Sequence, residues 1–209
     1  MKIESVIRKR LKEFENLGKN GNVEFDFNPF IGLKLKATIA TELAFCISTA
    51  NSTAVSGLVF QKSLENMDLE MLKRNEVEGL MKSAGVRFYP KKAGYVISAI
   101  RNFRLVKPAL REEDKKARDI LVKYVKGLGY KEASHFLRNI GRKDVAIIDR
   151  HILRWLYKNG KITAIPKTVP RTVYLRIEKI LEGIARDEGM NLAELDLRLW
   201  FEMTGKVLK

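Results

Sequence analysis

The chain has 209 residues, of which 45% are hydrophobic, enough for one sizeable domain or two small lobes that share a core. Its 40 lysines and arginines outnumber the 25 acidic residues, and the formal net charge of +15 favours a polyanionic partner over a merely lysine-rich surface of a heat-adapted protein. The single cysteine, Cys46, excludes an intrachain disulfide or a four-cysteine cluster, and its apolar surroundings predict a buried side chain.

Helical periodicity runs along most of the chain and predicts an all-α fold of about nine helices. The first predicted helix begins near Ile3 and ends at the glycines of NLGKNGN. The stretch 23–30, VEFDFNPF, alternates like a strand until Pro29, so we expect an extended connector with one weak strand at most. Further helices are predicted over 35–49, 50–64, 69–85, 92–106, 112–129, 131–141, 149–160, 171–189 and 191–205.

No apolar run approaches the roughly 20 residues that a membrane-spanning helix needs. The N-terminus is charged throughout, which is unlike a signal peptide. We therefore expect no membrane partner and no targeting signal, and a cytoplasmic or nucleoid-associated location.

The segment 126–141, KGLGYKEASHFLRNIG, predicts a turn between two helices. Gly127 and Gly129 allow positive φ and a close approach of the backbone to another surface. The helix that follows begins with unpaired N–H groups, which suit a phosphate. In a basic protein this pattern suggests a helix-hairpin-helix at about 115–141 that grips a DNA backbone, and an ordinary helix corner closed by glycine is the alternative.

The segment DVAIIDRHILR, at 144–154, is the second informative stretch. Asp149 follows an apolar run and lies where a helix N-cap is expected, at the rim of a cleft. His151, at the second or third helical position, could contact a phosphate or simply face solvent. His135, inside the hairpin helix, receives no role.

These two segments together closely resemble the archaeal-type 8-oxoguanine DNA glycosylase/AP lyase family, a compact branch of the HhH-GPD superfamily of base-excision repair enzymes. The segments ATELAFCISTAN, VRFYPKKAGYV and LDLRLWFEMTGKVLK also resemble that family, so the likeness spans roughly residues 38–209. Residues 18–36 are unlike it, and no role is assigned to them. The resemblance implies a two-lobed helical unit, with one lobe at about 36–116 and the other formed by 1–35 and 117–209.

The resemblance implies that Lys131 is a nucleophile and that Asp149, 18 residues later, is the catalytic acid. An amine that attacks the sugar carbon traps the charge that develops when a base leaves, and a carboxylate stabilises that charge. The resulting imine permits strand cleavage by β-elimination. Gly127, Gly129 and His151 would contact the DNA backbone.

The damaged base must leave the helix to reach such a site. By resemblance, Trp200 would stack on the flipped purine, and the terminal carboxylate of Lys209 would accept the N7 proton that distinguishes 8-oxoguanine from guanine. Core packing and a frayed terminus are the respective alternatives. Asn51 and Phe88 are candidates for the opposite base and the wedge, with core filling as the alternative for Phe88. Arg87, Lys91 and Lys92 would lie on the backbone side.

The expected partner is double-stranded DNA that contains 8-oxoguanine, bound by a monomer. The reaction implied needs no cofactor, metal or iron–sulfur cluster, and a monovalent cation at the hairpin is compatible with the fold. Two alternatives stay open: an endonuclease III-like glycosylase for oxidised pyrimidines, and a non-catalytic helix-hairpin-helix DNA-binding protein.

Overall fold

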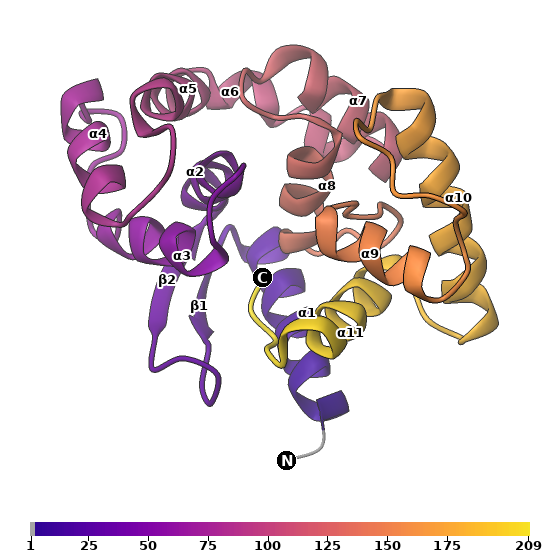
Figure 1. The fold of residues 1–209 in the computed structure, drawn as a ribbon. Helices are drawn as coiled ribbons and strands as arrows, with labels where there is room; N and C mark the ends of the chain where they lie inside the picture. Colours follow the sequence, from indigo (N-terminus) through magenta and orange to yellow (C-terminus); the bar gives the residue numbers. More distant parts are fainter. Residues whose placement is uncertain (1–2) are drawn as a thin grey trace.

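The structure is a computed structural model that describes residues 3–209. The chain folds into a mostly helical molecule with one small β-hairpin (Figure 1). The predicted all-α class is confirmed, although eleven α-helices rather than about nine lie within the described residues. The elements in chain order are α1 (Ile3–Asn20), β1 (Asn22–Asp26), β2 (Lys34–Thr38), α2 (Ile39–Thr49), α3 (Ala54–Ser63), α4 (Arg74–Ser83), α5 (Tyr89–Arg101), α6 (Phe103–Val106), the 3-10 turn η1 (Ala109–Arg111), α7 (Asp114–Tyr124), α8 (Tyr130–Asn139), α9 (Arg150–Lys158), α10 (Arg171–Asp187) and α11 (Leu192–Thr204).

The segment that follows α1 contains two strands instead of the one weak strand that we expect from the sequence. Strands β1 and β2 pair in antiparallel register, with Phe25 opposite Leu35. Leu35 and Ala37 are buried and alternate with the exposed Lys34, Lys36 and Thr38, which is the pattern of a half-buried strand rather than the helix predicted from residue 35. Helix α2 begins only at Ile39, because the Thr38 side chain caps it by accepting from the backbone N–H of Thr41.

The helix predicted over 92–106 is broken at Asn102 into α5 and α6. The Asn102 side-chain amide donates to the carbonyl of Ser98 at 2.8 Å, a local bond that competes with continuation of the helix. Periodicity therefore located the helical region correctly and missed its interruption.

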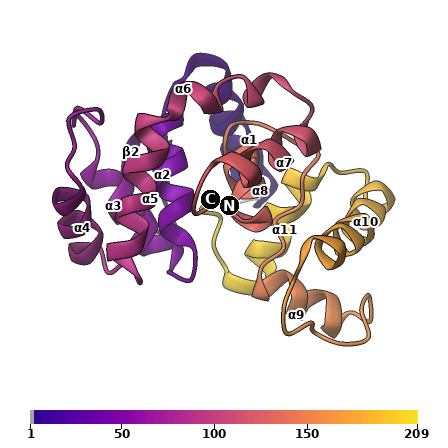
Figure 2. The same cartoon turned by 90° about the horizontal axis from the view of Figure 1, so that it is seen from above.

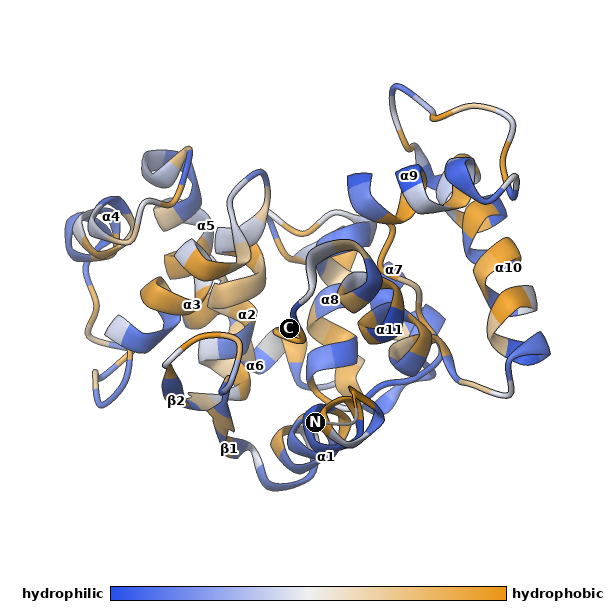
Figure 3. Ribbon diagram, turned by 60° about the horizontal axis from the view of Figure 1, so that its bottom comes forward, coloured by the Kyte–Doolittle hydropathy of each residue, from blue (hydrophilic) through white to orange (hydrophobic). Residues whose placement is uncertain are grey.

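The apolar core consists of two clusters. The larger joins α1, the hairpin, α2 to α5, α7 and α8, and it includes Val207 and Leu208 of the C-terminal segment. The smaller lies among α9, α10 and α11, and Figure 3 shows the apolar and polar sides of α10. The larger cluster contains residues from both predicted lobes, and the lobe boundaries stay a prediction.

The C-terminus lies in the middle of the molecule rather than at its edge. In Figures 1 and 2 it ends between the part that contains α2 and α5 and the part that contains α8 and α11. The last three residues are buried.

None of the helices within residues 3–209 is both long and apolar enough to cross a bilayer.

Candidate active site

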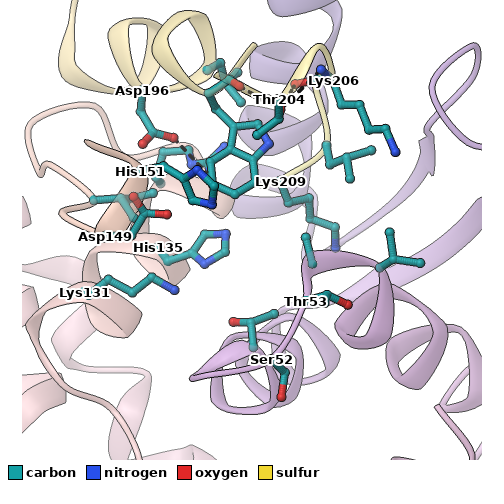
Figure 4. A pocket seen from close by; sticks show the side chains of 18 residues that line it. Ser52, Thr53, Lys131, His135, Asp149, His151, Asp196, Thr204, Lys206 and Lys209 are labelled. Carbon is teal, nitrogen blue, oxygen red and sulfur yellow. Dashed lines mark hydrogen bonds and ion pairs between the residues drawn. The ribbon is translucent and has the colours of Figure 1, made fainter. Parts of the chain in front are cut away.

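A cavity of about 410 Å³ opens between α8, α11 and the loop that precedes α3. It collects five residues that the sequence singled out, from four separate parts of the chain (Figure 4). They are Lys131, Asp149, His151, Trp200 and Lys209. Residues up to 160 positions apart in the sequence, such as Thr49 and Lys209, therefore line the same cavity.

Helices α7 and α8 and the turn between them form the predicted hairpin. Gly127 has φ of +94°, and a Cβ at this position would lie 2.7 Å from the ring of Tyr95. Only glycine therefore satisfies both the backbone angle and the close approach. Gly129 has ordinary extended φ and is the N-cap of α8, which puts Lys131 at the second helical position.

Asp149 is the N-cap of α9, as its sequence position predicts. Its Oδ1 accepts from the backbone N–H of Ile152 at 2.9 Å, which fixes the carboxylate at the cavity wall. His151 follows at the second position of α9, and its ring meets that of Trp200 edge-on, with the centroids 5.0 Å apart. A structural cap and a cavity-facing carboxylate thus coexist in one residue.

Helix α8 presents a polar stripe to the cavity that the sequence interpretation missed. Lys131, His135 and Arg138 recur at i, i+4 and i+7 and all line the cavity, so their spacing was a usable signal. Burial, together with the charges of Arg138, Lys131 and Lys209, lowers the pKa of His135 well below its usual value. His135 therefore lines the wall as a neutral imidazole.

Asp196 on α11 is a second cavity carboxylate that was not singled out. It is four residues from Leu192 and three from Leu199, on the buried face of the helix, and its Oδ2 lies 3.3 Å from Nη2 of Arg138. Burial raises its pKa to about 6, against the opposing attraction of Arg138, and the nearby Asp149 contributes in the same direction. A carboxylate at an apolar helix position is the signal that could have identified it.

Trp200 and Lys209 are both fixed parts of the wall. Trp200 is half-buried, and within residues 3–209 its indole N–H is a buried donor that finds no acceptor. The frayed-terminus alternative for Lys209 is wrong, because the residue is buried and its ammonium lies 2.7 Å from Oε2 of Glu42. The lysine side chain has no exposed surface, so the part of Lys209 that reaches the cavity is its main chain.

Asn51 and Phe88 lie apart from Lys131, in a neighbouring cavity of about 500 Å³ that Gly127 also lines. Phe88 is 60% exposed, so core filling does not explain it. Both residues have positive φ, +54° and +57°, which is unusual for a residue other than glycine and a strain for a bulky aromatic. The structure therefore brings the two wedge candidates together at the hairpin turn.

Lys92 differs from its predicted place on the DNA-backbone side. It is buried, and its ammonium donates to the carbonyl of Ser48 and to Oγ of Ser52 at 2.7 and 2.9 Å. Lys92 thereby fixes the turn that carries Asn51, and burial lowers its pKa to about 8. The adjacent Lys91 is exposed.

Cys46 is buried as predicted, and burial raises the pKa of its thiol well above the usual value.

A family model described as 8-oxoguanine DNA glycosylase matches residues 7–190. The 8-oxoguanine DNA glycosylase/AP lyase of Methanocaldococcus jannaschii is 46% identical over 99% of this chain and 93% of its own length, and that of Aquifex aeolicus is 40% identical over 99% and 94%. This chain belongs to the 8-oxoguanine DNA glycosylase family.

Solved structures agree with this family membership. The crystal structure of the M. jannaschii 8-oxoguanine glycosylase/lyase with a 15mer DNA containing 8-oxoguanine superposes with a TM-score of 0.86 at 45% identity, covering 100% of this chain and 94% of that one. The Thermotoga maritima 8-oxoguanine DNA glycosylase superposes with a TM-score of 0.85 at 32% identity, covering 99% and 92%.

In this family member the cavity combines an amine, two carboxylates and a half-buried indole. No group of histidine, cysteine, aspartate or glutamate side chains suited to a metal ion occurs in the described part of the chain. The arrangement can attack an electrophilic carbon, stabilise positive charge beside it and stack on a planar ring.

Proposed function

We propose that this chain is a bifunctional DNA repair enzyme that excises 8-oxoguanine and then cleaves the abasic strand. The observation that carries the proposal is that Lys131 and Asp149 line one cavity that also contains a stacking indole and the chain terminus. The family membership and the net charge of +15 support a DNA substrate. The enzyme would act as a monomer on duplex DNA, and hence be nucleoid-associated.

The chemistry begins when Nζ of Lys131, as a free amine, bonds to C1′ of the damaged nucleotide. The bond from C1′ to N9 of the base breaks, the base departs with the bonding pair and takes up a proton, and the amine loses one. Asp149 stabilises the positive charge that develops on the sugar. Its Oδ1 is held by Ile152, so the carboxylate needs no reorganisation during this step.

Strand cleavage follows from the covalent intermediate. The sugar ring opens to an imine between Nζ and C1′, which makes the C2′ proton acidic. When that proton leaves, the bond from C3′ to O3′ breaks and the 3′ phosphate departs with the oxygen and the bonding pair. The product is an unsaturated imine, and water then releases the lysine. Neither step requires a cofactor or a metal, and a monovalent cation at the hairpin turn stays a prediction.

Recognition of the base would use the wall opposite the nucleophile. The face of Trp200 stacks on the purine, and the terminal carboxylate of Lys209 accepts the N7 proton of 8-oxoguanine. Guanine has an acceptor at N7, so it would leave the two acceptors facing each other. Gly127, Gly129 and His151 would hold the DNA backbone, while Asn51 and Phe88 would occupy the opposite-base side.

Borohydride trapping tests the substrate and the nucleophile together. The chain is incubated with duplexes that contain 8-oxoguanine, thymine glycol or an abasic site, and covalent complexes are resolved by denaturing electrophoresis. We expect trapping on 8-oxoguanine and abasic DNA but not on thymine glycol. Trapping on thymine glycol and abasic DNA but not on 8-oxoguanine would favour the endonuclease III-like alternative, and trapping on none would favour a DNA-binding module.

The variant Lys131→Gln identifies the nucleophile. It should keep duplex affinity and lose both the trapped complex and strand cleavage, because glutamine cannot form an imine. Lys179→Gln, an exposed residue of α10 that lines neither cavity, is the matched control and should trap like the wild type. A trapped complex with Lys131→Gln would remove Lys131 from the mechanism.

A further inference from the structure

The side chain of the C-terminal residue is held in a fully buried polar cluster behind the active-site cavity. Lys209 Nζ lies 2.7 Å from Oε2 of Glu42 and also donates to Oε1 of Gln61. Gln61 Nε2 donates to Oε2 of Glu42 at 2.9 Å, and Asn139 Nδ2 donates to Oε1 of Glu42 at 2.6 Å. Glu42 therefore receives three donors, from three separate parts of the chain.

Aromatic rings complete the ammonium site. Lys209 Nζ lies 4.2 Å from the ring centroid of Phe25 and 4.4 Å from that of Phe45. Phe25 belongs to strand β1, in the segment 18–36, for which the resemblance implies no role. The β-hairpin of β1 and β2 thus helps to enclose the Lys209 side chain.

Burial of this cluster costs desolvation free energy, and stability alone does not explain why it is there. Two charged groups are removed from water here, and a buried ion pair is weak evidence for stability, since well-packed apolar residues often do as well. Its geometric effect is specific, however. The lysine side chain is pinned on the core side and the main chain of the same residue lines the cavity, so the terminal carboxylate is fixed through one short tether.

We propose that Glu42 is a positioning residue: by holding the Lys209 ammonium from behind the cavity, it sets the place of the terminal carboxylate and thereby determines the discrimination of 8-oxoguanine from guanine. The inference rests on the proposed function. Glu42 does not line the cavity, so it acts only through Lys209. Gln61 and Asn139 hold the two oxygens of the Glu42 carboxylate in the orientation that faces the ammonium.

Three variants of the full chain test this: Glu42→Gln, Lys209→Met and the double variant. Two rates are measured under single turnover, 8-oxoguanine release from a duplex and strand cleavage at a preformed abasic site. Lys131 and Asp149 are untouched, so abasic cleavage should stay near the wild-type rate. The ratio of 8-oxoguanine release to abasic cleavage should fall about 10- to 100-fold in each single variant, the scale of a group misplaced by about 1 Å.

The double variant separates positioning from general damage to the core. Because both changes break the same link, its ratio should equal that of Lys209→Met alone rather than the product of the two losses. Multiplying losses, or a parallel fall in both rates, would overturn the proposal. Lys179→Met serves as the control for loss of a lysine elsewhere and should keep the wild-type ratio.

Thermal unfolding of each variant shows whether it folds. If Glu42→Gln and Lys209→Met do not, the milder Gln61→Met decides, because it removes one donor and one acceptor of the cluster with little change in volume. A folded variant with the wild-type ratio overturns the positioning role of Glu42 while the proposed function stands. A wild-type chain that releases no 8-oxoguanine overturns the proposed function itself, and this inference with it.

Discussion

Asp149 combines two requirements in one side chain. Its Oδ1 accepts from the N–H of Ile152, which is what any aspartate at a helix N-cap does. The same residue lines the cavity with Lys131. In the proposed function its carboxylate stabilises the positive charge that develops on the sugar. Substitutions can separate the two effects because asparagine caps a helix about as well as aspartate.

The variant Asp149→Asn should therefore keep its stability and lose chemistry. We expect a thermal midpoint close to that of the wild type, an unchanged dissociation constant for an 8-oxoguanine duplex and a single-turnover rate at least about 100-fold lower, the scale of losing one electrostatic contact to a transition state. Asp149→Ala, which lacks the cap, should in addition lose about 1 kcal/mol of stability. A wild-type rate for Asp149→Asn would reduce Asp149 to a cap.

Asp196 adds a pH dependence to the stability of the fold. Burial raises its pKa to about 6, above the ordinary value, so the folded state binds the proton more tightly than the unfolded state does. Its contribution to stability is therefore present in full below about pH 4 and is lost as the pH rises through about 6.

Comparison of the wild type with Asp196→Asn isolates this titration, because the asparagine carries no titrating proton. Between pH 4 and pH 7 the variant should gain stability relative to the wild type by on the order of 2 kcal/mol. The difference in unfolding free energy from denaturant titrations at several pH values measures it. A difference that does not change with pH would mean that Asp196 titrates near its ordinary value in the folded chain.

At the scale of elements, the hairpin of α7 and α8 connects the two cavities. Its turn contributes Gly127 to the cavity of Asn51 and Phe88, and its second helix contributes Lys131 to the cavity of Asp149. A single short turn thus links the cavity of Asn51 and Phe88 to the cavity of Lys131. Any displacement of the turn is expected to affect both.

Gly127→Ala should displace it. The added methyl would meet the Tyr95 ring at 2.7 Å, and φ of +94° is strained for alanine, so we expect a loss of roughly 1–3 kcal/mol together with weaker duplex binding. Gly183→Ala in α10 has no neighbour within 4 Å and should stabilise the chain by about 0.5–1 kcal/mol. Denaturant unfolding and a binding titration of both variants make the comparison. Equal behaviour of the two alanines would contradict a special role for the turn.

The elements show which features the sequence can predict. Helices of the hairpin and the Asp149 cap follow from local spacing, and both are confirmed. Periodicity predicts helix over strand β2, because its apolar residues run directly into those of α2 and only the Thr38 cap separates the two elements. The contact of Glu42 with Lys209 spans 167 positions, so no local pattern in the chain could reveal it.

At the scale of the whole molecule, the C-terminal segment closes the site. Val207 and Leu208 belong to the larger core cluster. The Lys209 ammonium contacts Glu42 of α2 and Gln61 of α3, and Glu42 in turn accepts from Asn139 of α8. The last three residues are therefore part of the packed interior, and the position of the cavity wall at Lys209 depends on α2, α3 and α8.

The formal charge of +15 should make binding to undamaged duplex strongly dependent on salt. If six to ten phosphates are neutralised, affinity should fall about 10³- to 10⁵-fold between 50 and 200 mM salt. Lys91 is exposed beside the cavity of Asn51 and Phe88, so Lys91→Gln should lower the slope of log affinity against log salt by about 1. Fluorescence anisotropy across a salt series measures both slopes.

Two further variants locate the charge that matters. Lys179→Gln removes one formal charge from α10, so an unchanged slope there with a reduced slope for Lys91→Gln would assign the phosphate contacts to the face with the two cavities. Lys131→Gln should also leave the slope unchanged, because in the proposed function Nζ of Lys131 faces the sugar rather than a phosphate. Equal reductions for Lys91→Gln and Lys179→Gln would instead mean that the overall field of the molecule, and not a defined face, drives the association.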